Sequence, residues 1–594
     1  MFTLSRNRFI LIWLVGGLLV VLVRALAVVD LGYDLTVQLQ AAQNLLAGHG
    51  LSIHNLGGQD DLAQPARLIT LTHFPLAYPV MAAALMSLGL ALTGAVQVAG
   101  AIATIFGWWG WAVLAYAFFR EFLNRSSFWS WAAIIVAFSS PLLLTPPWGG
   151  TDIFLWAFLP WVLYWLGQGA TRSSGGWWFD WAAGVGCGLA FLFRYAGAFL
   201  LVYAALVILC QTRFAWKPLF RRGAILASGA LPLIAVQIYI NKFVAGPAQN
   251  AAAVDIGHGL TPYLKTFAAS FWMLPAANFS YAWWMPSRLL NLVAQPVGTL
   301  LGPIGPHGSW LMAVPLIAVI FIAPPVMLWA GNWKFPADVR TVAVGLFWFL
   351  PLFLWACTIV GVSNPLMGDY SFVADFRYYT PLIPLSVLVA IALASKTSVA
   401  ENAIRKMVRL ASGAYALAYI ALAVVGVLLL ITPMSLGNGK RQKLLGTSHL
   451  YRWPGSGVEY DFSATRRRAL DLLRQNPDAI LITDQPQWFY AEPKIDRSRI
   501  HRFGDLKSTY VNGPAEIFVV SWDAPGGRDD DFYWRLVSGP PRRSDELTGL
   551  DNFHLVDRFP AEQMKILETE VPASKRVGLK AAGDNGAVAA TPPN

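Results

Sequence analysis

Long apolar runs separated by short basic clusters dominate the chain up to residue 433. Runs of about 20 apolar residues match the hydrocarbon thickness of a bilayer, roughly 30 Å. The clusters of Lys and Arg between the runs orient successive spans, because basic residues stay on the cytoplasmic side. Arg6 and Arg8 precede the first run and place the N-terminus in the cytoplasm. The predicted spans are 9–29, 96–119, 127–145, 152–170, 177–194, 197–212, 223–241, 310–331, 341–362, 379–395 and 412–433.

The segment 75–93 is apolar, but we do not count it as a span. A crossing there would place Arg120 and Arg125 outside, against the positive-inside rule, so we predict an interfacial or re-entrant helix on the outer side. About eleven spans then remain. The first outer loop 30–75, the large loop 242–308 and the C-terminus all lie on the outer side.

Beyond residue 433 the composition becomes that of a soluble domain. "FSATRRRALDLLRQNPDAILITDQ" predicts a helix followed by a short strand, and "AEIFVVSW" and "NFHLVDRFP" predict further strands. We therefore expect a small α/β domain over 434–572 on the outer, periplasmic side, followed by a disordered Gly/Ala/Pro-rich tail at 573–594. The fold class is a polytopic α-helical membrane protein with a transmembrane domain over 1–433 and this C-terminal domain.

Composition supports a membrane protein and argues against nucleic-acid binding. Of 594 residues 56% are hydrophobic and 13% charged, and the mean hydropathy is +0.50. The formal charge of +11 comes from basic clusters at the ends of spans, where they signal topology. Cys187, Cys210 and Cys357 fall inside apolar segments without metal-ligand spacing, so neither a disulfide framework nor zinc is indicated.

Two carboxylates, Asp30 and Asp34, stand where the first span leaves the bilayer. The following "LTVQLQAAQNLLAGHGL" predicts an amphipathic helix at the outer surface, which Gly48 and Gly50 end. Asp34 then lies at the helix N-terminus, where the helix dipole favours its ionised form. Helix capping and a functional role are both open for Asp34 from spacing alone.

Four segments together resemble the membrane-embedded glycosyltransferases of the GT-C superfamily. They are "AAQNLLAGHGL" (41–51) after Asp34, "FPLAYP" (74–79), "TDIFLWAFLPWVLYWL" from Thr151, and "RYYTPLIPLSVLVAIALA" from Arg377. The likeness is greatest to the bacterial branch related to protein O-mannosyltransferases and lipid A aminoarabinose transferases. It covers roughly residues 1–433, as a pattern of hydropathy with a few fixed residues.

The resemblance implies roles for single residues. It implies that the first outer loop carries the catalytic carboxylate, which its register places at Asp34, with Asp30 second. It also implies a polyprenyl-phosphate sugar as donor, met at the membrane surface. Such a donor already has a good leaving group, so the enzyme has to supply a base for the acceptor hydroxyl and cations for the departing phosphate.

Further candidates lie at the predicted outer ends of spans. The candidates for binding the donor phosphate are Arg377, with Tyr378 beside it, and Arg194 in "FLFRYAG". Arginine suits this role because its guanidinium forms bidentate hydrogen bonds with phosphate oxygens. Asp152 and His73 are candidates for acceptor or metal contact. The alternatives are an interfacial snorkelling role for the arginines, a helix cap for Asp152 and a polar interface role for His73.

The metal requirement is open. In the resembling family an acidic residue often follows the catalytic Asp directly, whereas Leu35 follows Asp34 here. We therefore require no cofactor, and a divalent metal remains an alternative. Asp60 and Asp61 form an adjacent acidic pair, which we interpret as a solvated turn.

The sequence thus predicts an inverting glycosyltransferase of the bacterial inner membrane, acting at its outer face. Its partners would be membrane lipids, a polyprenyl-phosphate sugar and an acceptor that is a protein, a lipid or a polysaccharide. Two alternatives belong to other classes: a transporter or flippase of lipid-linked sugars, and a non-catalytic subunit of a polysaccharide-assembly complex. Transporters usually carry ionisable groups in the middle of spans, whereas these candidates gather at one face.

Overall fold

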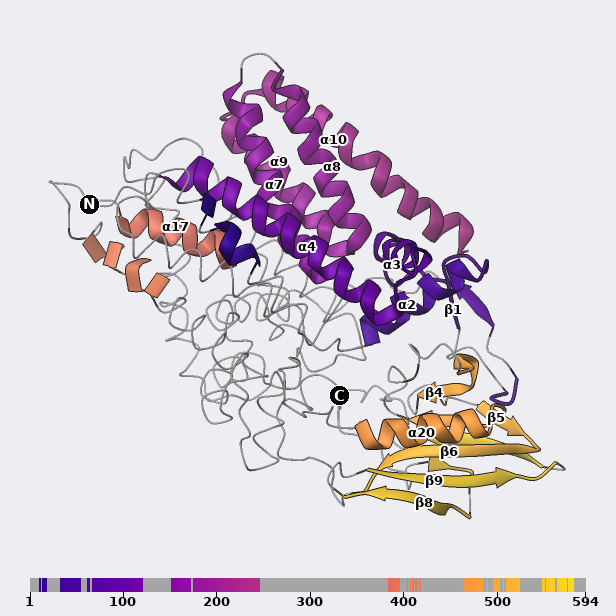
Figure 1. Cartoon of the computed structure of the whole chain (residues 1–594). Coiled ribbons are helices and arrows are strands. Elements are labelled where there is room, and N and C mark those ends of the chain that lie inside the picture. The colour runs from indigo at the N-terminus through magenta and orange to yellow at the C-terminus, as the bar shows by residue number, and fades with distance from the viewer. Residues whose placement is uncertain are drawn as a thin grey trace, which may run out of the picture. The chain divides into compact units, whose positions relative to one another are not determined.

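The computed structural model divides the chain into two compact units, each described separately here (Figure 1). The helical unit comprises Met1–Asp30 and Thr72–Ser456, and the sheet unit comprises Leu31–Leu71 and Gly457–Asn594. The residues that the structure describes are 10, 11, 13–18, 33–54, 61–64, 67–120, 151–172, 175–245, 383–395, parts of 403–417, 463–483, 489, 495–502, 506, 509–523, 547–550, 552–560, 564–573 and 575–581.

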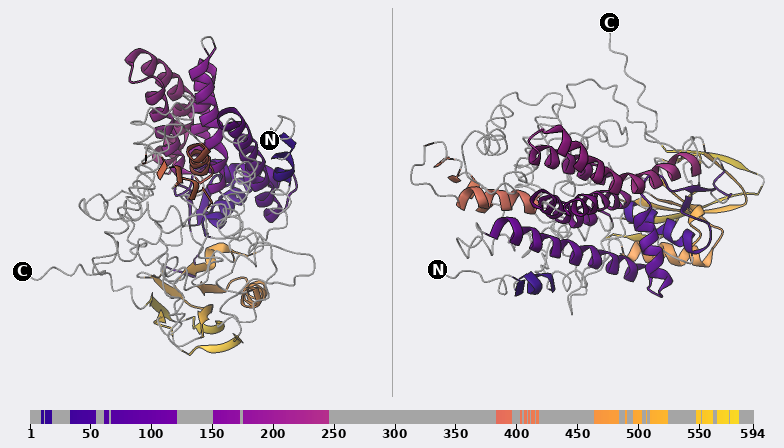
Figure 2. Two further views of the ribbon diagram at one scale, coloured as in Figure 1. Left: turned by 90° about the vertical axis from the view of Figure 1, so that its left-hand side faces the viewer. Right: turned by 90° about the horizontal axis from the view of Figure 1, so that it is seen from above.

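The long helices within residues 92–119 and 152–244 lie side by side, and the further views show the same arrangement (Figures 1 and 2). In the described part of the chain, Leu92–Phe119, Asp152–Thr171 and Trp216–Val244 are long and apolar enough to cross a membrane. The predicted spans in these three places are confirmed as helices. The described helices of this unit include α3 (Ala77–Ser87), α4 (Leu92–Leu114), α7 (Asp152–Thr171), α8 (Trp177–Phe193), α9 (Ala198–Gln211), α10 (Trp216–Tyr239) and α17 (Ile383–Ser395).

Within the segment 75–93 the structure has the short helix α3, and the prediction that this segment does not cross the membrane stays a prediction. Its 11 residues are about 16 Å long at 1.5 Å per residue, roughly half of a hydrocarbon core. The predicted spans 127–145, 310–331 and 341–362 lie outside the described residues, so the number of spans stays a prediction.

Small residues allow α8 and α10 to approach closely. A Cβ at Gly184 of α8 would lie 2.0 Å from the carbonyl oxygen of Leu226, and one at Gly229 of α10 would lie 2.5 Å from the carbonyl oxygen of Trp181. Helix association in membranes depends on this kind of backbone approach, because lipid offers no hydrophobic driving force between helices. Packing at these two glycines thus fixes the position of α8 relative to α10.

One turn before Gly184, a buried ion pair joins the same two helices. The Arg222 guanidinium donates from Nε to Oδ2 of Asp180 (2.8 Å) and from Nη2 to Oδ1 (2.7 Å). Arg222 also donates to Oε1 of Gln211 (2.7 Å) and to the carbonyl oxygen of Leu166 (3.1 Å). The pair is therefore well supplied with hydrogen bonds, as a charge removed from water has to be.

Removing one partner of this pair is expected to destabilise the helical unit. Arg222→Gln leaves the buried Asp180 carboxylate without its cation, which should lower the free energy of unfolding by about 3 to 5 kcal/mol. The double variant Asp180→Asn, Arg222→Gln should lose less unfolding free energy, because no unpaired charge stays buried. Chemical unfolding of detergent-solubilised protein measures the difference, with the exposed neighbour Arg221→Gln as control. Equal stability of Arg222→Gln and Arg221→Gln would contradict the expectation.

The sheet unit contains a five-stranded mixed sheet in the order β4-β3-β6-β9-β8 and a three-stranded sheet in the order β5-β10-β7. β3 is parallel to β4 and β6, whereas β9 is antiparallel to β6 and β8. The elements are α20 (Ser463–Gln475), β3 (Ile480–Thr483), β4 (Ile500–Arg502), β5 (Thr509–Asn512), β6 (Ala515–Trp522), β7 (Leu547–Thr548), β8 (His554–Phe559), β9 (Met564–Val571) and β10 (Arg576–Ala581).

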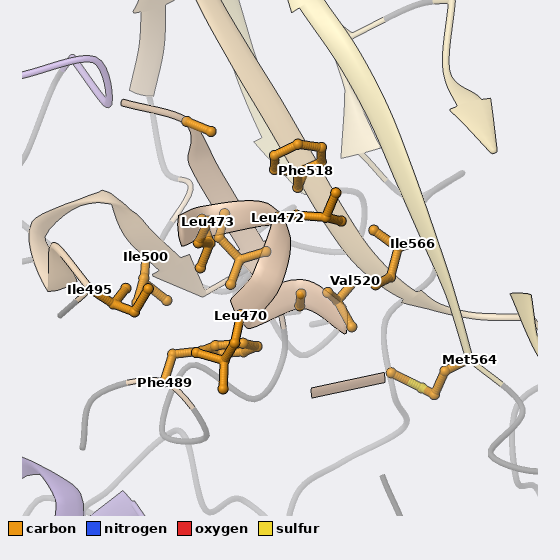
Figure 3. Packing of buried hydrophobic residues seen from close by; sticks show 13 residues of the cluster. Leu470, Leu472, Leu473, Phe489, Ile495, Ile500, Phe518, Val520, Met564 and Ile566 are labelled. Atoms are coloured by element: carbon orange, nitrogen blue, oxygen red, sulfur yellow. The ribbon is translucent and has the colours of Figure 1, made fainter. Parts of the chain in front are cut away.

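Alternation along β6 separates two hydrophobic clusters. Phe518 and Val520 belong to the cluster that α20 shares with the sheet (Figure 3), and Ile517 and Val519 belong to the cluster on the other face. Side chains of a strand alternate between faces, so one strand contributes to both clusters. The predicted helix, the strand after it, "AEIFVVSW" and the strand within "NFHLVDRFP" are all confirmed.

Two predicted boundaries of the C-terminal domain differ from the structure. Residues 576–581, predicted as part of a disordered tail at 573–594, form β10, which pairs with β5 from Arg576 opposite Asn512 onward. Residues 31–71, predicted as a loop of the membrane domain, belong to the sheet unit. They form α2 (Tyr33–Leu46) and the hairpin of β1 (Ser52–His54) and β2 (Leu68–Thr70). The physical reason is burial: the Leu62 side chain is 1% exposed and belongs to the hydrophobic cluster that contains Ile517 and Val519 of β6.

His501 of β4 makes the stability of the sheet unit depend on pH. Its side chain is fully buried, and neither ring nitrogen has a hydrogen-bond partner in the described structure. Burial, and to a smaller extent the charge of Arg499, lower the pKa of His501 to about 4, and Asp496 opposes this shift. The ring is therefore neutral in the folded protein at neutral pH.

The unfolded chain binds more protons than the folded chain between pH of about 4 and about 6.5, so stability should fall as the pH falls through that window. The expected loss is about 3 kcal/mol in total. Hydrogen exchange of β3 and β4 in the full chain at pH 7 and pH 4.5 measures it. His501→Phe should flatten the dependence, and an unchanged dependence in that variant would assign it to other groups.

Candidate functional site

A buried ion pair joins the start of α7 to the end of α8. Asp152 is the first residue of α7, and Arg194 directly follows α8. Nη1 of Arg194 lies 2.8 Å from Oδ1 of Asp152 and donates to Oγ1 of Thr151 at 3.3 Å. The two side chains are 14% and 7% exposed, respectively. The structure thus brings together two residues that the sequence analysis treated as separate candidates.

The pairing constrains what each residue can do. The Asp152 carboxylate lies at the N-terminal end of α7, the positive end of the helix dipole. The carboxylate in turn holds the guanidinium in one orientation. A pre-oriented arginine suits phosphate binding, since less side-chain freedom is lost when the ligand arrives. The observed geometry therefore fits Asp152 as a positioning partner of Arg194.

A hydrogen-bond network anchors the segment 72–76 to the helical unit. The hydroxyl of Tyr195 donates to the carbonyl oxygen of Thr72 at 2.7 Å, and the backbone N–H of Leu76 donates to Oε1 of Gln237 at 2.9 Å. Nδ2 of Asn241 donates to the Tyr195 oxygen at 2.9 Å. Gln237 also donates to Asn241 at 2.8 Å. The segment is consequently fixed at both ends.

The sequence analysis missed Tyr195, Gln237 and Asn241. Gln237 and Asn241 are two amides one helical turn apart within the apolar run "LIAVQIYINKF". Polar side chains in a membrane helix usually face a partner, because an unpaired polar group in hydrocarbon is costly. The spacing of these two amides was the sequence signal that could have identified them. For Tyr195 the signal was its position directly after the candidate Arg194.

His73 lies on the anchored segment, between Thr72 and Leu76, and is exposed. Tyr78, a few residues further on, packs edge-on against Phe154, with ring centroids 6.3 Å apart. Phe154 stacks on Phe193 at 3.8 Å. The segments "FPLAYP", "TDIF" and "FLFRYAG" therefore meet at one end of the helical unit.

The helix α2 begins at Tyr33, which places Asp34 in its first turn, as predicted. The helix ends at Leu46, and Gly48, which the sequence predicted to end it, follows with a φ of +81° that glycine adopts at little cost. The N–H of His49 donates to the carbonyl of Asn44 and that of Gly48 to the carbonyl of Leu45, the Schellman pattern. Asp34 belongs to the sheet unit, so a site shared by Asp34 and Arg194 stays a prediction.

Polar side chains of α2 continue into the hairpin. Nε2 of Gln40 lies 2.7 Å from Nδ1 of His54, and Nδ2 of Asn44 donates to the carbonyl of Ser52 at 2.8 Å. Burial lowers the pKa of His54; Arg497 and His49 lower it as well, and Asp496 opposes them. A neutral imidazole nitrogen accepts the amide hydrogen, so this pKa and the geometry agree.

Several predicted residues lie outside the described residues, namely Asp30, Arg377 and Tyr378. Within the described ranges, no group of three or more His, Cys, Asp or Glu side chains is arranged to hold a metal ion. Asp61 differs from its prediction as a solvated turn residue, since it is 8% exposed and hydrogen-bonded to Asn512.

Comparison with known proteins yields a structural likeness alone. No protein-family model and no curated protein matches the chain. Among solved structures the chain is similar to ArnT from Cupriavidus metallidurans bound to undecaprenyl phosphate, with 11% identity and a TM-score of 0.39. It is also similar to ArnT of the same organism in the apo state, with 12% identity and a TM-score of 0.40. Both alignments cover 95% of this chain and 98% of ArnT. Such values are too low to transfer a function, so the proposal below is based on this chain's own residues.

Proposed function

We propose that the protein is an inverting glycosyltransferase that moves a sugar from a polyprenyl-phosphate donor to an acceptor hydroxyl at the outer face of a bacterial inner membrane. One observation carries the proposal. The buried Asp152–Arg194 pair and the anchored segment that bears His73 meet at one end of a unit of membrane-length helices. A lipid-phosphate donor has to be met at such an end, where its head group leaves the bilayer.

The reaction is a single displacement. The Asp34 carboxylate takes the proton of the acceptor hydroxyl, and the acceptor oxygen forms a bond to the anomeric carbon. The bond between that carbon and the donor phosphate oxygen breaks, and its electron pair stays on the phosphate. Inversion of the anomeric carbon follows, because one nucleophile acts once.

Cations stabilise the leaving phosphate as its charge grows. We assign this role to Arg194 and to Arg377, with Tyr378 as a hydrogen-bond donor. Asp152 orients Arg194, and His73 contacts the acceptor. We place the base at the membrane surface because a carboxylate within hydrocarbon would be protonated at neutral pH.

A transporter of the same lipid-linked sugar is the competing class. Its ionisable groups would be expected near the middle of the spans. In the described helices, Asp152 begins α7, Arg194 follows the end of α8, and Asp180 lies in the first turn of α8. The Asp152–Arg194 pair therefore stands at helix ends, which favours an enzyme with a site at the surface.

The experiment that tests the proposal is a transfer assay with membranes. Membranes from cells that express the protein, and from cells that lack it, are supplied with radiolabelled polyprenyl-phosphate sugars. The proposal predicts label in an acceptor fraction only when the protein is present. Equal labelling of both membranes, with any of the sugars, would count against a glycosyltransferase.

A further inference from the structure

The first-loop segment 31–71 and the C-terminal α/β elements are tied together at a buried carboxylate. Oδ1 of Asp61 accepts the N–H of Ala63 at 3.0 Å and that of Asn512 at 3.2 Å, and Oδ2 accepts Nδ2 of Asn512 at 2.8 Å. Asp61 is 8% exposed. A carboxylate that accepts several N–H groups in a buried place is a strong and directional contact.

The next residue extends this contact into the hydrophobic core. The N–H of Leu62 donates to the carbonyl of Tyr510 at 2.9 Å, and Asp61 forms an isolated parallel bridge with Tyr510. The Leu62 side chain belongs to the cluster that contains Val511 of β5 and Ile517 of β6. Hydrogen bonds and apolar burial therefore act at the same place, which we call the Asp61 tie.

A second contact reaches the helix that carries Asp34. Nη2 of Arg497 donates to Oε1 of Gln43 in α2. Arg497 is 8% exposed and begins a short 3₁₀ turn, where the Asp496 carboxylate caps the N–H of Ser498 at 3.0 Å. The arginine thus projects from a fixed turn of the C-terminal part onto α2. We call this contact the Arg497 tie.

We propose that the C-terminal α/β module positions the first-loop helix α2, with Asp61 and Arg497 as positioning residues for the base Asp34. The proposal rests on the glycosyltransferase function proposed above. It gives the C-terminal module a task within the reaction: α2 is one continuous helix from Tyr33 to Leu46, so a constraint on Gln43 is passed to the turn that holds Asp34.

The test compares four variants of the full-length protein. Asp61→Ala removes both acceptor oxygens and leaves buried N–H groups unpaired. Asp61→Asn keeps one acceptor oxygen for the two backbone N–H groups, and its amide can donate to Asn512 after a rotation of that side chain. Asp471→Ala is the matched control, because Asp471 of α20 is 54% exposed and pairs with Arg474, which is 48% exposed. Arg497→Ala tests the second tie independently.

Two readouts separate positioning from folding. Hydrogen exchange of residues 33–46 reports the constraint on α2, and initial rates of sugar transfer give kcat and the donor KM. We expect faster exchange and a roughly ten- to hundredfold lower kcat in Asp61→Ala and Arg497→Ala, at unchanged donor KM. Asp61→Asn and Asp471→Ala should resemble the wild type.

Each other outcome has a definite meaning. Unchanged exchange in α2 overturns the ties, and faster exchange at unchanged kcat overturns the positioning role. If Asp61→Ala fails to fold, Arg497→Ala decides by the same two readouts. A wild type that transfers no sugar contradicts the proposed function instead, and the exchange rates then still decide whether the module holds α2.

Discussion

Replacing Asp34 with Asn is expected to lower kcat for sugar transfer by about 10²- to 10⁴-fold, the range in which general bases contribute. The amide keeps the size of the side chain but cannot accept the proton of the acceptor hydroxyl. Since Asp34 makes no contact with the donor phosphate in the proposed mechanism, the KM for the donor should stay the same. Initial rates at matched protein levels measure both parameters.

The control for this prediction is Asp30→Asn, which removes the neighbouring carboxylate. We expect that variant to retain most of the wild-type rate. Loss of transfer in Asp30→Asn alone would move the base to Asp30, the second candidate of the sequence analysis. Full activity of both variants would remove the general base from the first outer loop.

Replacing Arg194 with Gln is expected to affect both stability and donor binding. The buried Asp152 carboxylate loses its partner, which should cost about 3 to 5 kcal/mol of unfolding free energy. The departing phosphate also loses a cation, so kcat/KM for the donor should fall by roughly 10²-fold or more. Chemical unfolding in detergent and initial-rate kinetics measure the two effects separately.

The double variant Asp152→Asn, Arg194→Gln separates the effect on stability from the effect on sugar transfer. It removes both charges, so most of the stability should return, because no uncompensated charge stays buried. Transfer should remain low, since the cation is still missing. Arg172→Gln is the matched control, because Arg172 is an exposed arginine that follows the opposite end of α7. Recovery of transfer in the double variant would make the pair structural and remove Arg194 from the phosphate site.

Local patterns in the sequence predicted the elements of the fold well. The apolar run after Thr151 gave α7 with its correct start, and the alternating "AEIFVVSW" gave β6. Gly48 marked the end of α2, since glycine readily adopts the left-handed conformation required there. In each case the signal lies within the residues of the element itself.

Features that depend on distant partners were beyond such patterns. Asp61 looks like a turn residue until Asn512 is known to lie beside it, 451 positions away. The strand at 576–581 exists through its pairing with β5, and its sequence resembles the tail that follows. Likewise Asp152 and Arg194 were both candidates, but their pairing depends on how α7 and α8 pack.

The most direct test of the central claim uses purified protein in proteoliposomes, which contain a radiolabelled polyprenyl-phosphate sugar and an envelope extract as source of acceptor. The polyprenyl phosphate released from the donor is measured together with label in the acceptor. The account predicts that both appear in equal amounts with the wild type and that both disappear with Asp34→Asn. Movement of the intact donor between leaflets, without cleavage of its sugar–phosphate bond and equal in both proteins, would contradict the account and identify a transporter.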